Sequence, residues 1–237
     1  MAKETRLNDT ADIYTKRENQ TEKQKLGDMT ITEKFQYFKD YYFKKIFMVC
    51  LLSGIAIWFL YTVLSPKTET VLYAAIINDA LDNEKTDVLT KELEQYYKIN
   101  PEKQEIVLDY NFYIDEENGG TETTASVQKL GTYVAAEQID VIITDEKTFQ
   151  GYAYNGYFVD LADQLPTDLY SNLSDSFFMS ETDEKKTEKN AYGVYLTDCE
   201  KYKNLGSMIE KPVIGIVANS KYRENGADFI KYLYDLK

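Results

Sequence analysis

The dominant feature of the hydrophobic pattern is one long apolar run. Nineteen residues without a charge, IFMVCLLSGIAIWFLYTVL, occupy positions 46–64. Because a helix rises about 1.5 Å per residue, a run of this length crosses the roughly 30 Å hydrocarbon layer of a bilayer. A buried helix of a soluble core is the alternative, but core helices of this length usually keep a polar face. We therefore predict a transmembrane helix over residues 46–64.

Lysine residues are distributed unequally around this run. They lie mainly before it: Lys34, Lys39, Lys44 and Lys45 within 20 residues on that side, and Lys67 alone within 20 residues on the other. Positive charge is retained on the cytoplasmic side, which predicts a cytoplasmic N-terminus and an extracytoplasmic C-terminal part. The long head and the lack of a small-residue cleavage pattern in TVLSPK indicate an uncleaved anchor in the plasma membrane.

The residues before the run divide into two segments. Residues 1–28 are polar and of mixed charge, without apolar periodicity, and we expect a disordered cytoplasmic tail. In residues 29–45, Thr30 and Glu33 have the spacing of a capping box, and aromatic residues recur at helical intervals. This pattern predicts an amphipathic juxtamembrane helix, with a simple extension of the transmembrane helix as the open alternative.

Strand and helix patterns alternate after a short polar tether at 65–70. Apolar runs at 70–77, 105–112 and 140–144 predict strands, and the segments between them have helical spacing. Short apolar strands separated by amphipathic helices are typical of parallel β-α-β units. We therefore expect an α/β fold: residues 71–237 form a single three-layer lobe with a mostly parallel sheet, in addition to the one N-terminal transmembrane helix.

The pattern changes towards the C-terminus. Residues 174–190 are polar and predict an exposed, flexible loop, whereas 191–197 and 212–220 predict two further strands. A closing helix follows, with Asn219 or Ser220 as its expected cap. Its buried side is expected to carry Ala227, Ile230, Leu233 and Tyr234.

Composition narrows the possible chemistry. The 27 basic and 40 acidic residues give a net charge of −13, which disfavours binding to nucleic acid. Histidine is absent, which removes His-based triads and the commonest zinc sites. Cys50 and Cys199 are the only cysteines, so the C-terminal part cannot form an internal disulfide. No phosphate loop, nucleophile elbow or metal-binding cluster is present, so we predict no catalysis, no metal and no cofactor.

Candidate ligand contacts follow from the expected sheet. Ligands of open parallel sheets bind beyond the carboxyl ends of the strands, near the point where strand order reverses. The rule selects the residues after three strands, among them Tyr113 and Thr144. The six predicted ligand contacts are Asn78, Asp79, Tyr110, Asp145, Glu146 and Phe149. Asp145 has an alternative interpretation as the cap of a helix that begins near Lys147. The aromatic residues that follow have two interpretations, a stacking platform for a ligand or ordinary packing; they are Tyr152, Tyr154, Tyr157 and Phe158.

Several segments resemble a known family. The run KLGTYVAAEQIDVIITDEKTFQGYAYNGYFVDLADQLP is similar to a segment of bacterial extracytoplasmic solute-binding proteins with the type 2 periplasmic-binding-protein fold. The matching positions are Asp140, Val141, Gly156, Asp160 and Leu161. The opening VLYAAIINDALDNEKTDVLTKELEQYY and the closing NGADFIKYLYD are similar to the first strand and helix and to the last helix of that family.

The resemblance implies a function, and two departures from the family modify it. Family members have two lobes, but only 24 residues separate Pro166 from Ala191 here, which indicates one lobe. They are usually secreted or lipid-anchored, whereas this chain has an apolar span. We expect a membrane-anchored solute-binding-like protein, an accessory of a bacterial import system with a membrane transporter as partner. The alternative is a non-transport envelope interaction or scaffolding protein that uses a degenerate solute-binding lobe.

Overall fold

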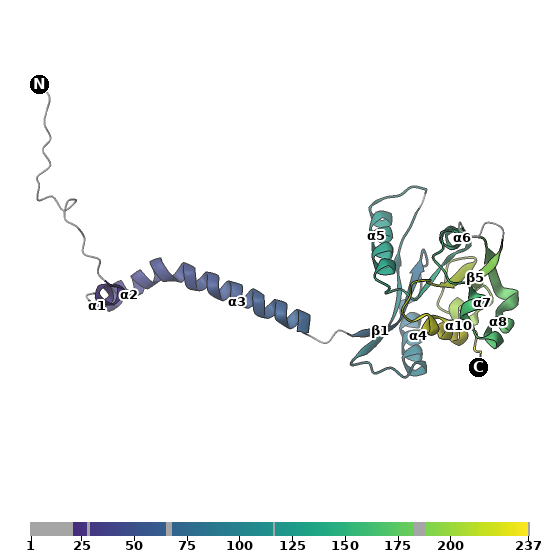
Figure 1. Cartoon of the computed structure of the whole chain (residues 1–237), viewed down its shortest axis with the longest axis horizontal. Helices are drawn as coiled ribbons and strands as arrows, with labels where there is room; N and C mark the ends of the chain where they lie inside the picture. Colours follow the sequence, from purple (N-terminus) through teal and green to yellow (C-terminus); the bar gives the residue numbers. More distant parts are fainter. Residues whose placement is uncertain (1–20, 28, 65–67, 116, 183–187, 237) are drawn as a thin grey trace, which may run out of the picture. The chain divides into compact units, whose positions relative to one another are not determined.

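The structure is a computed structural model of the 237-residue chain. It divides into two compact units, Met1–Ser65 and Pro66–Lys237, which we describe separately (Figure 1). The residues that the structure describes are 21–27, 29–64, 68–115, 117–182 and 188–236.

The first unit contains the predicted apolar helix. Helix α3 (Phe43–Leu64) has 22 residues and a mean hydropathy of 2.3, and none of its residues is buried. It contains the whole of 46–64 and begins three residues earlier. The absence of burial argues against a core helix. By its length and composition, α3 is long and apolar enough to span a membrane.

Helical structure also precedes α3. Helix α1 is Glu22–Gly27, α2 is Ile31–Tyr37, and the π-helix η1, Phe38–Tyr42, joins α2 to α3. Helix α1 differs from the disordered segment expected for 1–28, of which residues 1–20 and 28 lie outside the described residues. The capping box is confirmed, because the Thr30 amide donates to the Glu33 carboxylate and the Glu33 amide donates to the Thr30 hydroxyl.

The second unit is built on one six-stranded sheet of order β2-β1-β3-β6-β5-β4. The strands are β1 (Glu69–Ile77), β2 (Gln104–Phe112), β3 (Val141–Asp145), β4 (Phe177–Ser180), β5 (Asn190–Tyr195) and β6 (Pro212–Ile216). Strand β1 therefore begins inside the predicted tether, of which residues 65–67 are not described.

The sheet is mixed, which corrects the prediction of a mostly parallel sheet. Strand β1 is parallel to β2 and β3, but β6 is antiparallel to β3 and β5, and β4 is antiparallel to β5. All five residues of β6 are buried. A strand buried on both faces has the same continuous apolar pattern in either direction, so its sequence does not reveal its direction.

Helices cover both faces of the sheet and give an α/β fold with three layers (Figure 1). Leu72, Ala74 and Ile76 of β1 pack in the cluster that includes α4 (Asn83–Tyr96) and α10 (Arg223–Leu233). The alternating Tyr73, Ala75 and Ile77 pack in the cluster that includes α5 (Thr121–Ala135) and α6 (Glu146–Tyr154). The other helices of this unit are α7 (Leu161–Gln164), α8 (Thr167–Leu173), the 3₁₀ turn η2 (Ser174–Ser176) and α9 (Glu200–Lys203).

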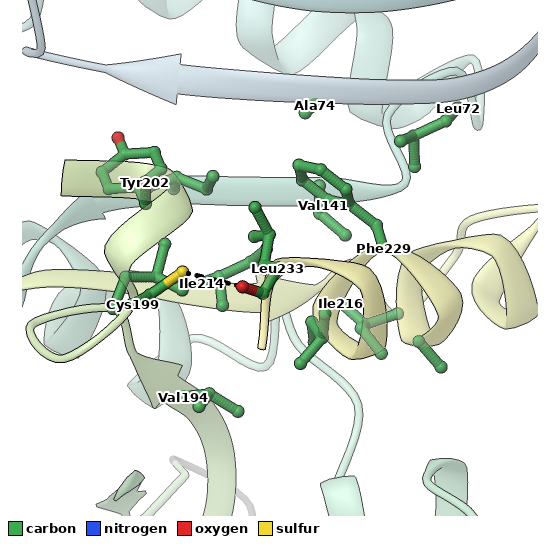
Figure 2. Close-up of a cluster of buried hydrophobic side chains, with 14 of the residues drawn as sticks. Leu72, Ala74, Val141, Val194, Cys199, Tyr202, Ile214, Ile216, Phe229 and Leu233 are labelled. Carbon is green, nitrogen blue, oxygen red and sulfur yellow. Dashed lines mark hydrogen bonds between the residues drawn. The ribbon is translucent and has the colours of Figure 1, made fainter. Parts of the chain in front are cut away.

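Figure 2 shows part of the first cluster, where residues of α9 and α10 meet the sheet. The thiol of Cys199 donates to the carbonyl oxygen of Leu233 at 3.3 Å, which joins the start of α9 to the end of α10 (Figure 2). Burial raises the pKa of this thiol. Cys199 is therefore a packing residue that uses its one donor inside the core.

Two C-terminal predictions need correction. Residues 174–180 of the expected loop form η2 and the edge strand β4, in which Phe178 is only 4% exposed; residues 183–187 are not described. The N-cap of α10 is Tyr222, without a side-chain cap, rather than Asn219 or Ser220. The expected burial of Ala227, Ile230 and Leu233 is confirmed, and Tyr234 is partly buried.

Candidate functional site

The strand order places a topological switch point between β1 and β3. The chain leaves β1 for β2 on one side and then returns to β3 on the other side of β1. The loops after β1 and β3 thus separate at the carboxyl ends of these strands, where open sheets bind ligands. A cavity of about 290 Å³ lies there. It is lined by Asn78, Tyr113, Ile114, Asp115, Glu117, Asp145, Lys147 and Thr148, and we call it the switch-point cavity.

Asn78 forms a rigid wall of the switch-point cavity. It follows β1 with a positive φ of 61°, which Asn tolerates better than most residues. Its side-chain amide donates to the carbonyl oxygen of Ile114 at 2.9 Å and accepts the amide of Ile114 at 2.8 Å. This pair of bonds joins the loops after β1 and β2. The side chain of Asn78 therefore holds the cavity together.

Asp145 is the cap of α6, as the alternative interpretation predicted. Its Oδ1 accepts the backbone amides of Lys147 and Thr148, each at 3.0 Å. Its Oδ2 accepts the hydroxyl of Thr144 at a longer 3.4 Å. Asp145 therefore fixes the start of α6 and places the carboxylate and the side chains of α6's first turn on the cavity wall.

Glu146 is directed to a different place. Its carboxylate accepts the hydroxyl of Tyr195 at 2.9 Å and forms an ion pair with Lys211 at 3.0 Å. The hydrogen bond from Lys211 is the main cause that lowers the pKa of Glu146. The residue thus links α6 to β5 and to the residue before β6, and it does not line the switch-point cavity.

Asp79 is a buried tie between distant segments. It is 6% exposed, and its carboxylate accepts the hydroxyl of Tyr202 at 2.8 Å, the hydroxyl of Ser207 at 2.6 Å and the amide of Met208 at 2.7 Å. Burial, with the carboxylate of Asp79 alongside, raises the pKa of Tyr202 well above its ordinary value. The carboxylate of Asp79 is thereby committed to holding the loop after α9.

Tyr110 and Phe149 also lie away from the cavity. The hydroxyl of Tyr110 donates to the side chain of Asn83, the first residue of α4, at 2.7 Å. Phe149 is fully buried and stacks on Phe158, with ring centroids 4.2 Å apart and planes 5° from parallel. Phe149 is therefore a core residue. Of the six predicted contacts, the structure brings only Asn78 and Asp145 into one cavity.

Tyr113, which the same rule selected, also lines the cavity, whereas the other lining residues were not predicted although the rule applies to them. Asp115 and Glu117 lie in the loop after β2, at the same edge of the sheet. Asp115 accepts the amides of Glu117 and Asn118, and its hydrogen bonds from Asn118 are the main cause that lowers its pKa. Lys147 pairs with Glu117 at 3.2 Å, and both side chains are about three-quarters exposed. The sequence signal was the position of this loop directly after a strand.

The charges of the switch-point cavity limit what it can do. Three carboxylates, those of Asp115, Glu117 and Asp145, face one ammonium group, that of Lys147. This balance favours a cationic or zwitterionic molecule over an anion. Within the described part of the chain, no group of three or more metal-ligating side chains is close enough to hold a metal ion.

A second, larger cavity lies between α4 and α9. Its volume is about 640 Å³, and its lining residues are Glu84, Lys85, Val88, Leu89, Glu92, Lys201, Asn204 and Leu205; we call it the α4/α9 groove. Val88 is 55% exposed there. Lys201 is held at one side, with its ammonium group 3.7 Å from the ring centroid of Tyr232 and 2.6 Å from the carboxylate of Asp235.

Comparisons with known proteins do not assign the site. The chain matches no protein-family model, no curated protein and no solved structure. The resemblance to bacterial solute-binding proteins therefore stays a prediction.

Proposed function

We propose that this chain is a single-pass plasma-membrane protein whose C-terminal α/β unit lies outside the cytoplasm and binds a small solute at the switch-point cavity. Helix α3 is the anchor, and the excess of lysines before it supports the orientation. In this proposal the unit works as a one-lobed solute-binding-like accessory of a bacterial import system.

The observation that carries the proposal is the position of the cavity. It lies where the loops after β1, β2 and β3 meet, at the edge of the sheet that open α/β folds use for ligands. The volume of about 290 Å³ is at the lower end of small-molecule sites. A solute of the size of an amino acid or a short amine is the appropriate class.

The charge of the wall refines this class. Asp115 and Asp145 are held in place by backbone amides, so their positions do not depend on a ligand. Glu117 and Lys147 are more exposed and pair with each other. The ammonium group of a zwitterion can bind Glu117 and its carboxylate can bind Lys147, in place of the ion pair between these two side chains. Because a single lobe leaves the ligand exposed to solvent on one side, we expect weak binding.

Calorimetric titration of the full-length protein in detergent micelles tests this proposal. The panel contains zwitterionic amino acids, cationic amines, neutral sugars and dicarboxylates. We expect heat from the first two classes alone. Equal responses to all four classes, or no response to any, would contradict the proposal.

Matched variants locate the binding. Glu117→Gln removes one exposed carboxylate from the wall and should weaken binding of the responding ligand by about two- to fivefold, as for a solvent-exposed charge pair. Glu102→Gln makes the same chemical change at the other end of β2, on an exposed residue outside the cavity. Affinity should be unchanged in this control.

A second candidate function is supported by the α4/α9 groove. It is larger than the switch-point cavity, and Val88 is its exposed apolar side chain, with the buried Leu89 and Leu205 beneath it. A groove of this kind suits an envelope protein rather than a solute, which corresponds to the non-transport interaction or scaffolding alternative.

Cross-linking in intact cells distinguishes this candidate. Val88→Glu places a charge in the α4/α9 groove, and Val127→Glu makes the same change on α5, where Val127 is 49% exposed. A cross-linked partner that is lost in the first variant and kept in the second would support the interaction function. A partner that is kept in both variants would exclude the groove.

A further inference from the structure

The helix that precedes α3 carries an exposed apolar stripe. Ile31, Phe35, Phe38 and Tyr42 recur at intervals of four, three and four residues and therefore share one face of a helix. Ile31 is 87% exposed, Phe35 72% and Phe38 48%. We call these four residues the aromatic stripe. Tyr42 is partly exposed, and its ring stacks on that of Phe38 with centroids 6.1 Å apart.

Charged side chains are ordered around the stripe. At about 100° per residue in α2, Lys34 lies on one flank of the stripe and Glu33 on the opposite side. In the wider π-helical turn of η1, Lys39 follows Phe38 on the other flank, and Asp40 lies further from the stripe. The ammonium group of Lys45 lies over the ring of Tyr42 at 6.0 Å. Cations beside an apolar face, with anions behind it, form the pattern of a helix that lies in a membrane interface.

The flanking lysines, Lys34 and Lys39, are available to bind anionic groups. Within the described residues, Lys34 and Lys39 form no ion pair, and Glu33 is occupied by the capping box with Thr30. Anionic lipid headgroups of the cytoplasmic leaflet attract such juxtamembrane lysines.

The stripe is also continuous with the apolar span. Its last member, Tyr42, lies four residues before Ile46, where the uncharged run begins. The segment η1 lies between α2 and α3, and it has the π-helical bond from the amide of Phe43 to the carbonyl oxygen of Phe38. A π-bulge of this kind is one of the few recognised causes of a sharp kink in a helix.

We propose that residues 31–42 lie along the membrane surface as an interfacial helix, with the aromatic stripe among the lipid chains and Lys34 and Lys39 on anionic headgroups. The end of η1, where Tyr42 is followed by Phe43, is the place where this helix turns into the span. The proposal rests on α3 as the anchor, which is part of the proposed function. A protein that covers the stripe is the competing occupant.

Tryptophan quenching in vesicles tests this placement without any other protein present. Full-length Trp58→Phe protein removes the only native tryptophan, and Phe35→Trp or Gln36→Trp then reports from the stripe or from beside it. The proteins are reconstituted in mixtures of phosphatidylcholine and phosphatidylglycerol that contain lipids brominated near the glycerol end of the chains. We expect at least about twofold stronger quenching for Phe35→Trp than for Gln36→Trp. Equal quenching of the two proteins overturns the proposal.

Lysine variants test the contribution of the headgroups. Lys34→Gln with Lys39→Gln, in the Phe35→Trp protein, should reduce quenching in vesicles with phosphatidylglycerol and leave it unchanged in pure phosphatidylcholine. No effect in either lipid overturns the headgroup assignment. Circular dichroism confirms that each variant keeps its helical content.

The native Trp58 separates failure of this proposal from failure of the anchor. It lies within α3 and should be quenched by brominated lipids in the unmodified protein. If Trp58 is not quenched, the anchor itself is refuted. If Trp58 is quenched and the Phe35→Trp protein is not, only the interfacial helix is refuted.

Discussion

The hydroxyl of Ser220 donates a 2.5 Å hydrogen bond to Oδ1 of Asp140 and so joins the loop after β6 to the residue that precedes β3. Oδ2 of Asp140 accepts the backbone amide of Tyr73 in β1 at 2.8 Å. One carboxylate thus connects three segments. Asp140 is 2% exposed, and burial raises its pKa to about 6 although the hydrogen bonds from Ser220, Tyr73 and Tyr222 act in the opposite direction.

This raised pKa predicts a pH dependence of stability. The pKa of Asp140 is higher in the folded protein than its ordinary 3.8, so the folded state binds its proton more tightly. The resulting stabilisation is fully present below about pH 4 and is lost as the pH rises through about 6. Asp140→Asn removes this titration while its amide can still bond Tyr73 and Ser220. Relative to wild type, the variant's free energy of unfolding should increase by up to about 3 kcal/mol between pH 4 and pH 7.

Denaturant unfolding of both proteins at several pH values measures this difference. All other carboxyl groups are common to the two proteins and cancel in the comparison. A difference between them that is constant from pH 4 to pH 7 would show that Asp140 has an ordinary pKa.

A second prediction concerns the packing of Phe149 against the sheet. A Cβ atom at Gly193 would lie 2.5 Å from Cζ of Phe149 and 2.7 Å from a methyl group of Val213. Both neighbours are fully buried and have no free space. Gly193→Ala should therefore lower the free energy of unfolding by about 1–3 kcal/mol, measured by denaturant titration.

Gly151 provides the matched control. It lies in α6, and nothing is within 4 Å of a Cβ atom built there. Gly151→Ala should stabilise the protein by up to about 1 kcal/mol through helix propensity. Equal effects of the two substitutions would mean that the close approach of Phe149 to β5 is not present in solution.

A third prediction distinguishes a structural from a ligand-binding role for Asp79. Asp79→Ala leaves the hydroxyl of Tyr202 and the amide of Met208 without their acceptor inside the protein. The loss should be about 3 kcal/mol or more in the free energy of unfolding, with or without solute. Asp82→Ala, which removes an exposed helix cap, should cost only about 1 kcal/mol. Similar costs for the two variants would contradict the buried tie.

A fourth prediction concerns orientation in the membrane. Cys199 is 2% exposed and Cys50 lies within α3, so an impermeant maleimide should label the native protein weakly in whole cells. Glu102→Cys should be labelled from outside, whereas Gln36→Cys should react only after lysis. The reverse result would place the α/β unit in the cytoplasm.

Local patterns predicted the parallel half of the sheet well. The first three strands were recognised because each is a continuous apolar run separated from the next by a long amphipathic helix, such as α4. In the antiparallel half, β5 and β6 were predicted as strands, but their direction and the strand β4 were not. Strand β4 has four residues next to a polar segment, and only Phe177, Phe178 and Met179 are apolar, which is too short for a periodicity.

The site was predictable only where chemistry is local. The cap at Asp145 follows from residues two and three positions away. The partners of Asp79 lie more than 120 residues further along the chain, so no window of sequence contains them. An apolar residue at the start of a helix is expected both for a ligand contact and for a core residue, so the local sequence does not distinguish them. Phe149 is buried because its ring packs against β5 at Gly193 and β6 at Gly215, which lie far along the chain.

Strand β6 lies between β3 and β5 although it is the last strand of the chain. During synthesis, therefore, β3 has an unpaired edge and β4-β5 is a separate ribbon until residues 212–216 have emerged. The two parts cannot join before that point, so completion of the sheet waits for β6. A nascent chain that stalls before Pro212 would expose the edge of β3, with Val141, Ile142 and Ile143, to aggregation and to quality-control proteases.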